Sequence, residues 1–222
     1  MVIRFRDRCD AGRQLARALK LPPGAAIQVL ALPRGGVPVA YEVALALDAP
    51  LDVFVVRKLG VPGHEELAMG AIAEGGFRVL NGDVIEGLGI SAATVDRVAA
   101  SEKLELARRE RLYRGTGAAP ELRNRTILLV DDGLATGSTM AAAVAGVRAH
   151  APARVIVAVP VASHEAMEML GQVADEVVAV LTPPYFGGVG EWYDDFSQTS
   201  DDEVRTLLEA ARRHAAPAAK GA

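Results

Sequence analysis

Two adjacent acids, Asp131 and Asp132, are the residues of this sequence whose type and spacing most clearly indicate chemistry. They follow a continuous apolar run at residues 127–130, which predicts a strand buried inside a parallel sheet. On a continuing strand the two carboxylates would point to opposite faces, and one would meet the core. The pair is better explained if the chain turns there and both acids face a polar ligand. A sugar diol fits, because each hydroxyl can donate a charge-assisted hydrogen bond to a carboxylate.

The segment after the acids is suited to binding an anion. Gly133 and Gly137 permit backbone conformations that other residues avoid, and hydroxyl residues flank the second glycine. A helix is predicted to begin at Ser138, so its free N–H groups and dipole would favour a phosphate. A diol site beside a phosphate site describes a cradle for ribose 5-phosphate. The predicted cradle comprises Asp131, Asp132, Gly133, Leu134, Ala135, Thr136, Gly137, Ser138 and Thr139.

Three alternative interpretations of the glycine-containing segments are weaker. An ordinary strand-to-helix turn would explain the hydroxyls as caps, but it leaves the acid pair without a salt partner in the sequence. A nucleotide-binding P-loop requires Lys after its second glycine, whereas Ser138 follows Gly137. Residues 87–92 match a dinucleotide fingerprint, yet no clear strand–helix–strand unit surrounds them, so a helix-entry turn is the better interpretation.

The elements that must position these residues alternate between strands and helices. Strands are predicted at 27–32, 51–56, 126–130, 154–161 and 176–181. Helices are predicted at 10–19, 37–47, 91–113, 138–150, 164–170 and 200–214. Short connections between them are typical of a parallel α/β sheet, whose ligands bind beyond the carboxyl ends of the strands.

Two segments fit this alternation less well. Residues 61–76 have weak periodicity and predict a long mobile loop or hairpin, followed by a short strand at 77–80. Near the N-terminus, Arg4, Arg6 and Arg8 occupy alternate positions, which predicts a half-buried edge strand. Nothing in the sequence supports a phosphate-binding role for these arginines.

Glycines and cations follow the first two predicted strands. Residues 33–36, Pro-Arg-Gly-Gly, come after the first strand, and Arg57 and Lys58 end the second. The glycines allow close backbone approach, and Arg34 can bind phosphate oxygens through two parallel hydrogen bonds. Neighbouring cations repel unless an anion lies between them. Solvated surface charges and a simple helix-entry turn are the alternatives for these segments.

Residues 130–139, Val-Asp-Asp-Gly-Leu-Ala-Thr-Gly-Ser-Thr, resemble the motif with which type I phosphoribosyltransferases bind 5-phosphoribosyl 1-pyrophosphate (PRPP). That motif is a hydrophobic strand, two acids, and then Thr-Gly followed by a small or hydroxyl residue. The order of the predicted strands agrees over roughly residues 25–182. The resemblance implies that family's fold, an α/β domain with a mainly parallel central sheet, flanking helices and a small hood at the C-terminal strand edge.

The resemblance also implies an activity: the Mg²⁺-dependent transfer of the 5-phosphoribosyl group from PRPP to a nitrogenous base or related amine, with release of pyrophosphate. Catalytic roles would fall on Asp131, Asp132 and Arg34, and the two acids would hold the metal, directly or through ribose or water. Ala135 stands where some relatives carry a candidate base, so this loop offers none. The implied pyrophosphate site comprises Arg34, Gly35, Gly36, Arg57 and Lys58.

Further expectations follow from the same resemblance. A non-proline cis peptide is expected near Arg34, and residues 61–76 are expected to close over bound PRPP. The acceptor would enter the hood, where aromatic residues gather between 185 and 196. Because aromatic rings stack on flat heterocycles, Tyr185 and Trp192 are predicted to contact the base, with a small satellite core as the alternative for each ring. A non-catalytic PRPP or nucleotide sensor of the same fold is the alternative function.

The composition restricts the cellular location and the kinds of binding partner that we expect. The net charge is −4 without a basic block, which argues against nucleic-acid binding. The single cysteine, Cys9, permits no intramolecular disulfide, and no apolar stretch reaches the roughly 18 residues of a membrane span. We therefore expect a cytoplasmic protein whose partners are small molecules, PRPP and a base, rather than nucleic acid or membrane. The family resemblance also implies that the protein forms a homodimer.

A single domain over residues 1–222 is predicted, since neither a repeat nor a linker divides the chain. Its core is expected at about 25–182, with hood and rim segments at 1–24, 61–76 and 183–200. The final helix, at 200–214, is preceded by a capping-box pattern of Ser200 and Glu203.

Overall fold

The structure is a computed structural model that describes residues 4–115 and 117–215. Within the first range, only the backbone of Glu66 is described. The first three residues of the predicted rim and the end of the predicted domain, 216–222, lie outside the described residues. No described helix is both long enough and apolar enough to cross a membrane.

The central sheet has five parallel strands in the order β2-β1-β6-β7-β8. Its strands are β1 (Ile27–Ala31), β2 (Leu51–Val53), β6 (Thr126–Val130), β7 (Arg154–Val161) and β8 (Glu176–Leu181). All five residues of β6 are buried, because helices cover both faces of the sheet. The continuous apolar runs in the sequence therefore predicted the parallel sheet correctly.

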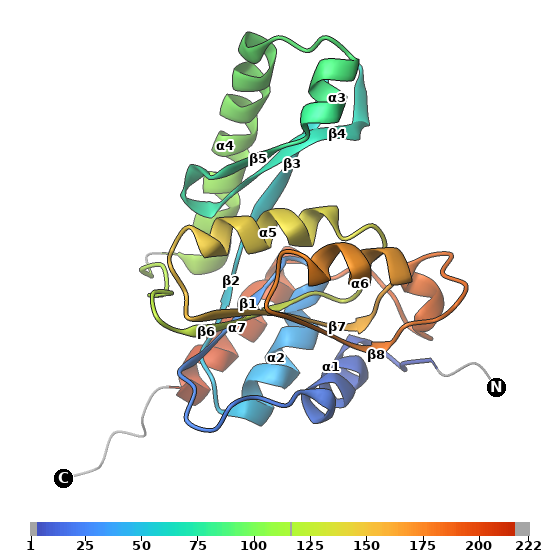
Figure 1. The fold of residues 1–222 in the computed structure, drawn as a ribbon. Coiled ribbons are helices and arrows are strands. Elements are labelled where there is room, and N and C mark those ends of the chain that lie inside the picture. Colours follow the sequence, from blue (N-terminus) through green and yellow to red (C-terminus); the bar gives the residue numbers. More distant parts are fainter. Residues whose placement is uncertain (1–3, 116, 216–222) are drawn as a thin grey trace.

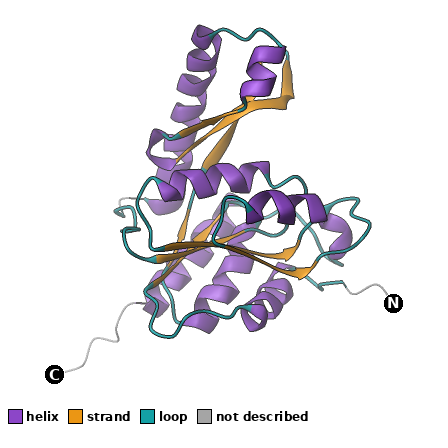
Figure 2. Ribbon diagram, in the orientation of Figure 1, coloured by secondary structure: helices purple, strands orange, loops and turns teal. Residues whose placement is uncertain are grey.

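Helices pack on both faces of this sheet (Figures 1 and 2). One face carries α1 (Arg8–Ala18), α2 (Gly36–Leu47) and α7 (Asp201–Ala215). The other carries α5 (Ser138–Arg148) and α6 (His164–Gly171). Alternate residues of β1 enter the two cores, with Val29 and Ala31 in one and Leu30 in the other. This confirms the predicted α/β fold with a mainly parallel central sheet and flanking helices.

A second unit, which we call the projecting module (residues 56–114), extends beyond α5 in Figure 1. Its antiparallel sheet, ordered β3-β4-β5, is followed by two helices. The module contains β3 (Val56–Val61), β4 (His64–Ala73), η1 (Glu74–Gly76), β5 (Arg78–Leu80), α3 (Gly82–Gly87) and α4 (Ala92–Arg114). The hairpin alternative for residues 61–76 and the short strand at 77–80 are thereby confirmed.

The prediction of one strand over 51–56 was wrong in its second half. β2 pairs with β1 over three residues and ends at Val53, and the chain then leaves the parallel sheet to pair with β4. Arg57 and Lys58 consequently lie on β3, in the projecting module, and not at the end of a parallel strand. The unbroken apolar run through Phe54 and Val55 hid this change of sheet, since both residues are buried where the two sheets meet.

The predicted N-terminal edge strand was also wrong. The Asp7 side chain accepts a hydrogen bond of 2.7 Å from the Asp10 backbone N–H and caps α1, which begins at Arg8. Phe5 makes only an isolated bridge with Tyr193, in the C-terminal rim (residues 183–200). Backbone bonds to the rim involve Phe5 and Arg6 but go no further, because the chain enters α1 directly after the Asp7 cap.

Candidate functional site

The strand order creates a switch point between β1 and β6. From β1 the chain passes through α2 to β2 on one side, whereas β6 leads through α5 to β7 on the other. The carboxyl ends of these neighbouring strands carry residues 33–36 and 131–139, the two segments singled out in the sequence. A hydrogen bond of 2.9 Å from the Leu32 N–H to the Val130 carbonyl joins the two strand ends. Open parallel sheets bind ligands at such a point.

The two glycines after β1 pack directly against the acid pair. A Cβ atom on Gly35 would collide with Oδ2 of Asp132. A Cβ atom on Gly36 would lie 2.8 Å from the Val130 carbonyl oxygen and 2.9 Å from Cα of Asp131. The Pro33–Arg34 peptide is cis, as the family resemblance implied. The predicted pyrophosphate loop and the predicted ribose acids are therefore brought together.

Asp132 has a salt partner that sequence reasoning missed. Nε of Arg8 donates to Oδ2 of Asp132 at 2.8 Å, and the side chains are only 11% and 15% exposed. Arg8 was singled out only as part of an edge strand. Its contact crosses 124 positions of sequence, so no local signal could have identified it.

Burial and mutual repulsion shape the acidity of the pair. Burial raises the pKa of Asp131, and the neighbouring Asp132 charge raises it further. Burial also raises the pKa of Asp132, but the Arg8 guanidinium opposes that shift. The Asp131 carboxylate accepts the Asp132 backbone N–H at 2.9 Å and has no ion-pair partner among the described residues. The site around Asp131 thus favours an incoming cation or hydrogen-bond donor.

The segment after the acids leaves its polar groups open to solvent. Ala135, Thr136, Ser138 and Thr139 are exposed. Gly137 has a φ of 74° and is the N-cap of α5, so it has no side chain to cap that helix; of the first N–H groups, that of Ser138 donates at 3.5 Å to Oγ1 of Thr136. The N-terminus of α5 is therefore suited to an anion.

Contacts with buried residues of β7 and with the C-terminal rim hold the loop that follows the acid pair in place. The Leu134 side chain is buried, and its N–H donates to the Val161 carbonyl at 2.9 Å. A Cβ atom on Gly133 would lie 2.5 Å from Cγ1 of Val189 in the C-terminal rim. The loop is thus fixed to β7 and to the rim, while its hydroxyls face outward.

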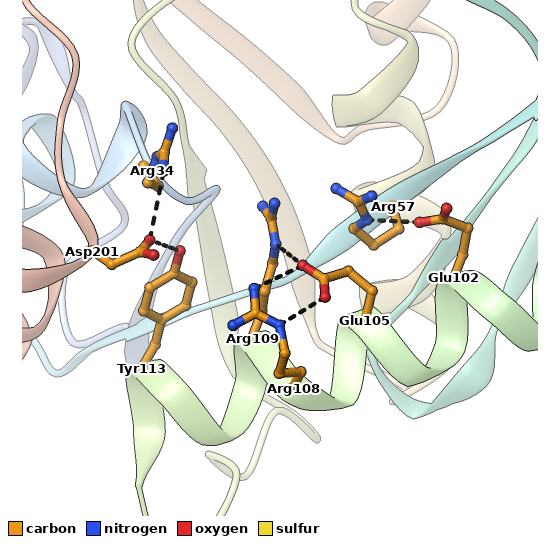
Figure 3. Close-up of polar contacts among 8 residues, drawn as sticks. All are labelled: Arg34, Arg57, Glu102, Glu105, Arg108, Arg109, Tyr113 and Asp201. Atoms are coloured by element: carbon orange, nitrogen blue, oxygen red, sulfur yellow. Dashed lines mark hydrogen bonds and ion pairs between the residues drawn. The ribbon is translucent and has the colours of Figure 1, made fainter. Parts of the chain in front are cut away.

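The three predicted cations occupy different places. Arg34 directly precedes Gly35, which packs on Asp132, but its own side chain has Nη1 3.8 Å from Oδ1 of Asp201 at the start of α7 (Figure 3). Arg57 instead pairs with Glu102 of α4 at 2.8 Å. Lys58 lines a cavity of about 430 Å³ between the projecting module and α5, and the start of α5 contributes to the same cavity. Lys58 and the start of α5 therefore share one space, whereas Arg57 forms an ion pair within the projecting module.

The aromatic cluster is largely engaged in packing. Tyr193 is buried, packs at a tilt against the rings of Phe5 and Phe196, and donates from its hydroxyl to the Asp132 carbonyl at 2.6 Å. Trp192 packs on the same cluster, with its indole N–H buried and unpartnered among the described residues. Tyr185 is 89% exposed. The base-stacking roles of Tyr185 and Trp192 stay predictions.

The donor set around the acid pair suits Mg²⁺ better than a closed metal site. Within the described residues, no three His, Cys, Asp or Glu side chains gather as metal ligands would. Mg²⁺ is commonly bound by one or two carboxylates, with substrate phosphates and water completing its coordination. Asp131 fits such a role, since it lacks an ion-pair partner in the described chain.

A family model for the phosphoribosyl transferase domain matches residues 10–182. The chain belongs to this family. The matched residues include both segments at the switch point and end one residue after β8, so they contain the whole central sheet and the projecting module. The similarity to this family is therefore not confined to residues 130–139 but covers most of the chain.

Relatives share both sequence and structure with this phosphoribosyl transferase domain. Proteins from two strains of Mycobacterium tuberculosis, provisionally named phosphoribosyl transferases, are 52% identical over 215 residues, which is 96% of this chain and 48% of theirs. The chain thus spans about half the length of these curated relatives. A Thermus thermophilus protein of known crystal structure is 46% identical, with a TM-score of 0.82 over 93% of this chain and 98% of that one.

Proposed function

We propose that the protein transfers the 5-phosphoribosyl group from PRPP to a nitrogenous base or related amine, releasing pyrophosphate, in a reaction that depends on Mg²⁺. The observation that carries the proposal is the meeting of residues 33–36 with Asp131 and Asp132 at one switch point. A sugar carrying phosphate groups at both ends matches a site with acids at its centre and anion-binding groups on either side.

Each part of the ligand has a matching group in this site. The exposed hydroxyls of Thr136, Ser138 and Thr139, with the first N–H groups of α5, suit the 5-phosphate. The acid pair suits the ribose hydroxyls. The guanidinium of Arg34, beside the backbone of Gly35 and Gly36, suits the pyrophosphate. When Mg²⁺ is bound with PRPP, it supplies charge stabilisation to the leaving pyrophosphate.

Catalysis in this proposal rests on positioning and electrostatics. The residues at the switch point hold the sugar so that a nitrogen nucleophile can approach the anomeric carbon. By analogy with the family, the sugar becomes cation-like as pyrophosphate leaves, and the carboxylate of Asp131 stabilises that charge. The motif loop offers no general base, because Ala135 stands at the position nearest that role. A required base would come from another segment or from the acceptor.

Calorimetry with PRPP and Mg²⁺ tests the binding half of the proposal. We expect Asp131→Asn to weaken PRPP binding by about 10- to 100-fold, since hydrogen bonds to a charged group contribute roughly 1.5–3 kcal/mol. Asp202→Asn is the matched control, because the Asp202 side chain is 91% exposed at the start of α7. Unchanged affinity in Asp131→Asn would contradict the ribose role.

Assays of pyrophosphate release test the transfer half. The protein is incubated with PRPP, Mg²⁺ and a panel of purine and pyrimidine bases and simple amines, and nucleotide products are measured. Base-dependent release of pyrophosphate is expected. Tight PRPP binding without any product across the panel would instead favour the sensor function.

A further inference from the structure

The Arg8 side chain joins three segments that are distant in sequence. Besides its bond to Asp132, its Nη1 donates to the Ser197 carbonyl at 2.6 Å, and its guanidinium lies 4.0 Å from the centre of the Phe196 ring. Its backbone is fixed at the first position of α1 by the Asp7 cap. Arg8 is therefore held by the rim on one side while it binds the acid pair on the other.

Asp132 is restrained from several directions. Its Oδ2 binds Arg8 and lies against Gly35. Its carbonyl oxygen accepts the Tyr193 hydroxyl, and its N–H donates to Asp131. Asp131, by contrast, accepts only a neutral backbone donor and has no ion pair among the described residues. The two neighbouring acids are thus in different electrostatic states.

We propose that Arg8 is a positioning residue that divides the roles of the two acids: it neutralises and holds Asp132, so that Asp131 alone is left to contact the sugar hydroxyls. This inference rests on the proposed function and refines it, because the two acids were predicted to share the ribose. The salt bridge between Arg8 and Asp132, which we call the clamp, holds the loop at residues 131–139 in place. Through Ser197 and Phe196, Arg8 also holds the C-terminal rim next to the site. It also cancels one negative charge in a pocket that must accept a polyanion.

Charge counting gives the expected order of affinities. Arg8→Gln leaves the carboxylate of Asp132 unpaired and adds one net negative charge to the site. Arg8→Gln with Asp132→Asn removes both charges and restores the original balance. The double variant should therefore bind PRPP more tightly than Arg8→Gln alone, although it has lost one more of the acids.

The experiment is a double-mutant cycle read by thermal unfolding and by PRPP calorimetry with Mg²⁺. We expect Arg8→Gln to lower Tm and to weaken PRPP binding on the order of tenfold, as the loss of a charge-assisted bond implies. Adding Asp132→Asn should recover part of both losses, whereas adding Asp131→Asn should weaken binding further. Arg6→Gln, which alters an exposed pair with Asp10, is the control and should change neither.

Two outcomes would overturn the division of roles. If the Arg8→Gln, Asp132→Asn variant binds PRPP about tenfold more weakly than Arg8→Gln, Asp132 is a ribose ligand in its own right. If the Tm loss of the double variant equals the sum of the losses of Arg8→Gln and Asp132→Asn, the side chains do not form the clamp. The Tm cycle needs no ligand, so it tests the clamp even if the wild-type protein fails to bind PRPP and the proposed function falls.

Discussion

At the level of single residues, the glycines after β1 set how closely the chain approaches the acid pair. Gly36 begins α2, where alanine would ordinarily be the better helix former. Its neighbours are backbone atoms of Val130 and Asp131, which cannot rotate away. The need for glycine at this position therefore arises from the neighbouring strand and not from the local helix.

Gly36→Ala is expected to lower Tm despite the higher helix propensity of alanine. The added Cβ would lie 2.8 Å from the Val130 carbonyl oxygen, so β1 and β6 would have to separate at the site. Gly82→Ala is the control, because a Cβ there meets nothing within 4 Å at the start of α3. Thermal unfolding of both variants checks this, and equal Tm values for the two would contradict the steric argument.

The phenol of Tyr113 offers a test through pH. Burial and its 2.7 Å hydrogen bond to Asp201 raise the pKa of Tyr113 to about 12, from an ordinary value of 10.0. The unfolded chain therefore loses this proton first, and the stabilisation present below pH 10 is lost as pH rises towards 12. We expect the free energy of unfolding to fall more steeply over this interval in the wild type than in Tyr113→Phe. Parallel curves would show that the phenol titrates normally.

At the level of elements, Arg114 at the end of α4 ties the projecting module to the central sheet. Its Nε donates to Asp52 on β2 at 2.9 Å, and Nη1 donates to Glu74 in η1 at 2.7 Å. A further bond of 3.1 Å reaches the Val53 carbonyl. Because the Arg114 side chain is only 8% exposed, solvent does not replace these bonds when they are lost.

Arg114→Met should destabilise the fold strongly. It keeps most of the apolar stem but leaves two largely buried carboxylates, Asp52 and Glu74, without their ion-pair partner, at a cost of about 3–5 kcal/mol. Arg108→Met on the same helix is the control: its side chain is 60% exposed in its pair with Glu105, so a loss below about 1 kcal/mol is expected. Denaturant unfolding measures both, and losses of similar size would contradict the anchoring role.

At the scale of the whole molecule, the central sheet and the projecting module differ in how deeply their strands are buried. Every residue of β6 is buried, whereas all three residues of β5 are exposed. Several large apolar side chains are also exposed on the module. These include Leu67, Phe77, Val79, Leu80, Leu88 and Leu104. The module is therefore less covered than the central sheet, and the bonds of Arg114 to Asp52 and Val53 are among those that join it to the rest of the protein.

Hydrogen exchange should separate these two parts. We expect the amides of β6 to exchange only through global unfolding, because opening that strand disrupts both cores. The amides of β5 should exchange through a local opening of lower free energy. Arg114→Met should lower the protection of β5 more than its effect on global stability accounts for. Uniform protection across both sheets would contradict the distinction.

Local sequence patterns by themselves determined the elements of the central sheet and the chemical character of its loops. The apolar runs identified the strands, and the side-chain types of the residues from Asp131 to Thr139 were the basis for the predicted ligand class. The Ser200 cap was predicted for the same reason, since it depends on a bond from an N–H three residues ahead. Such features are encoded within a few neighbouring residues.

Only the tertiary structure decided which groups meet at the site. It placed β1 beside β6, moved Arg57 into the projecting module, and brought Arg8 to Asp132. The physical reason is that hydrophobic periodicity reports which face of an element is buried but not which element covers it. A salt bridge spanning 124 positions depends on the packing of α1, the loop after β6 and the rim together, and no short stretch of sequence contains that information.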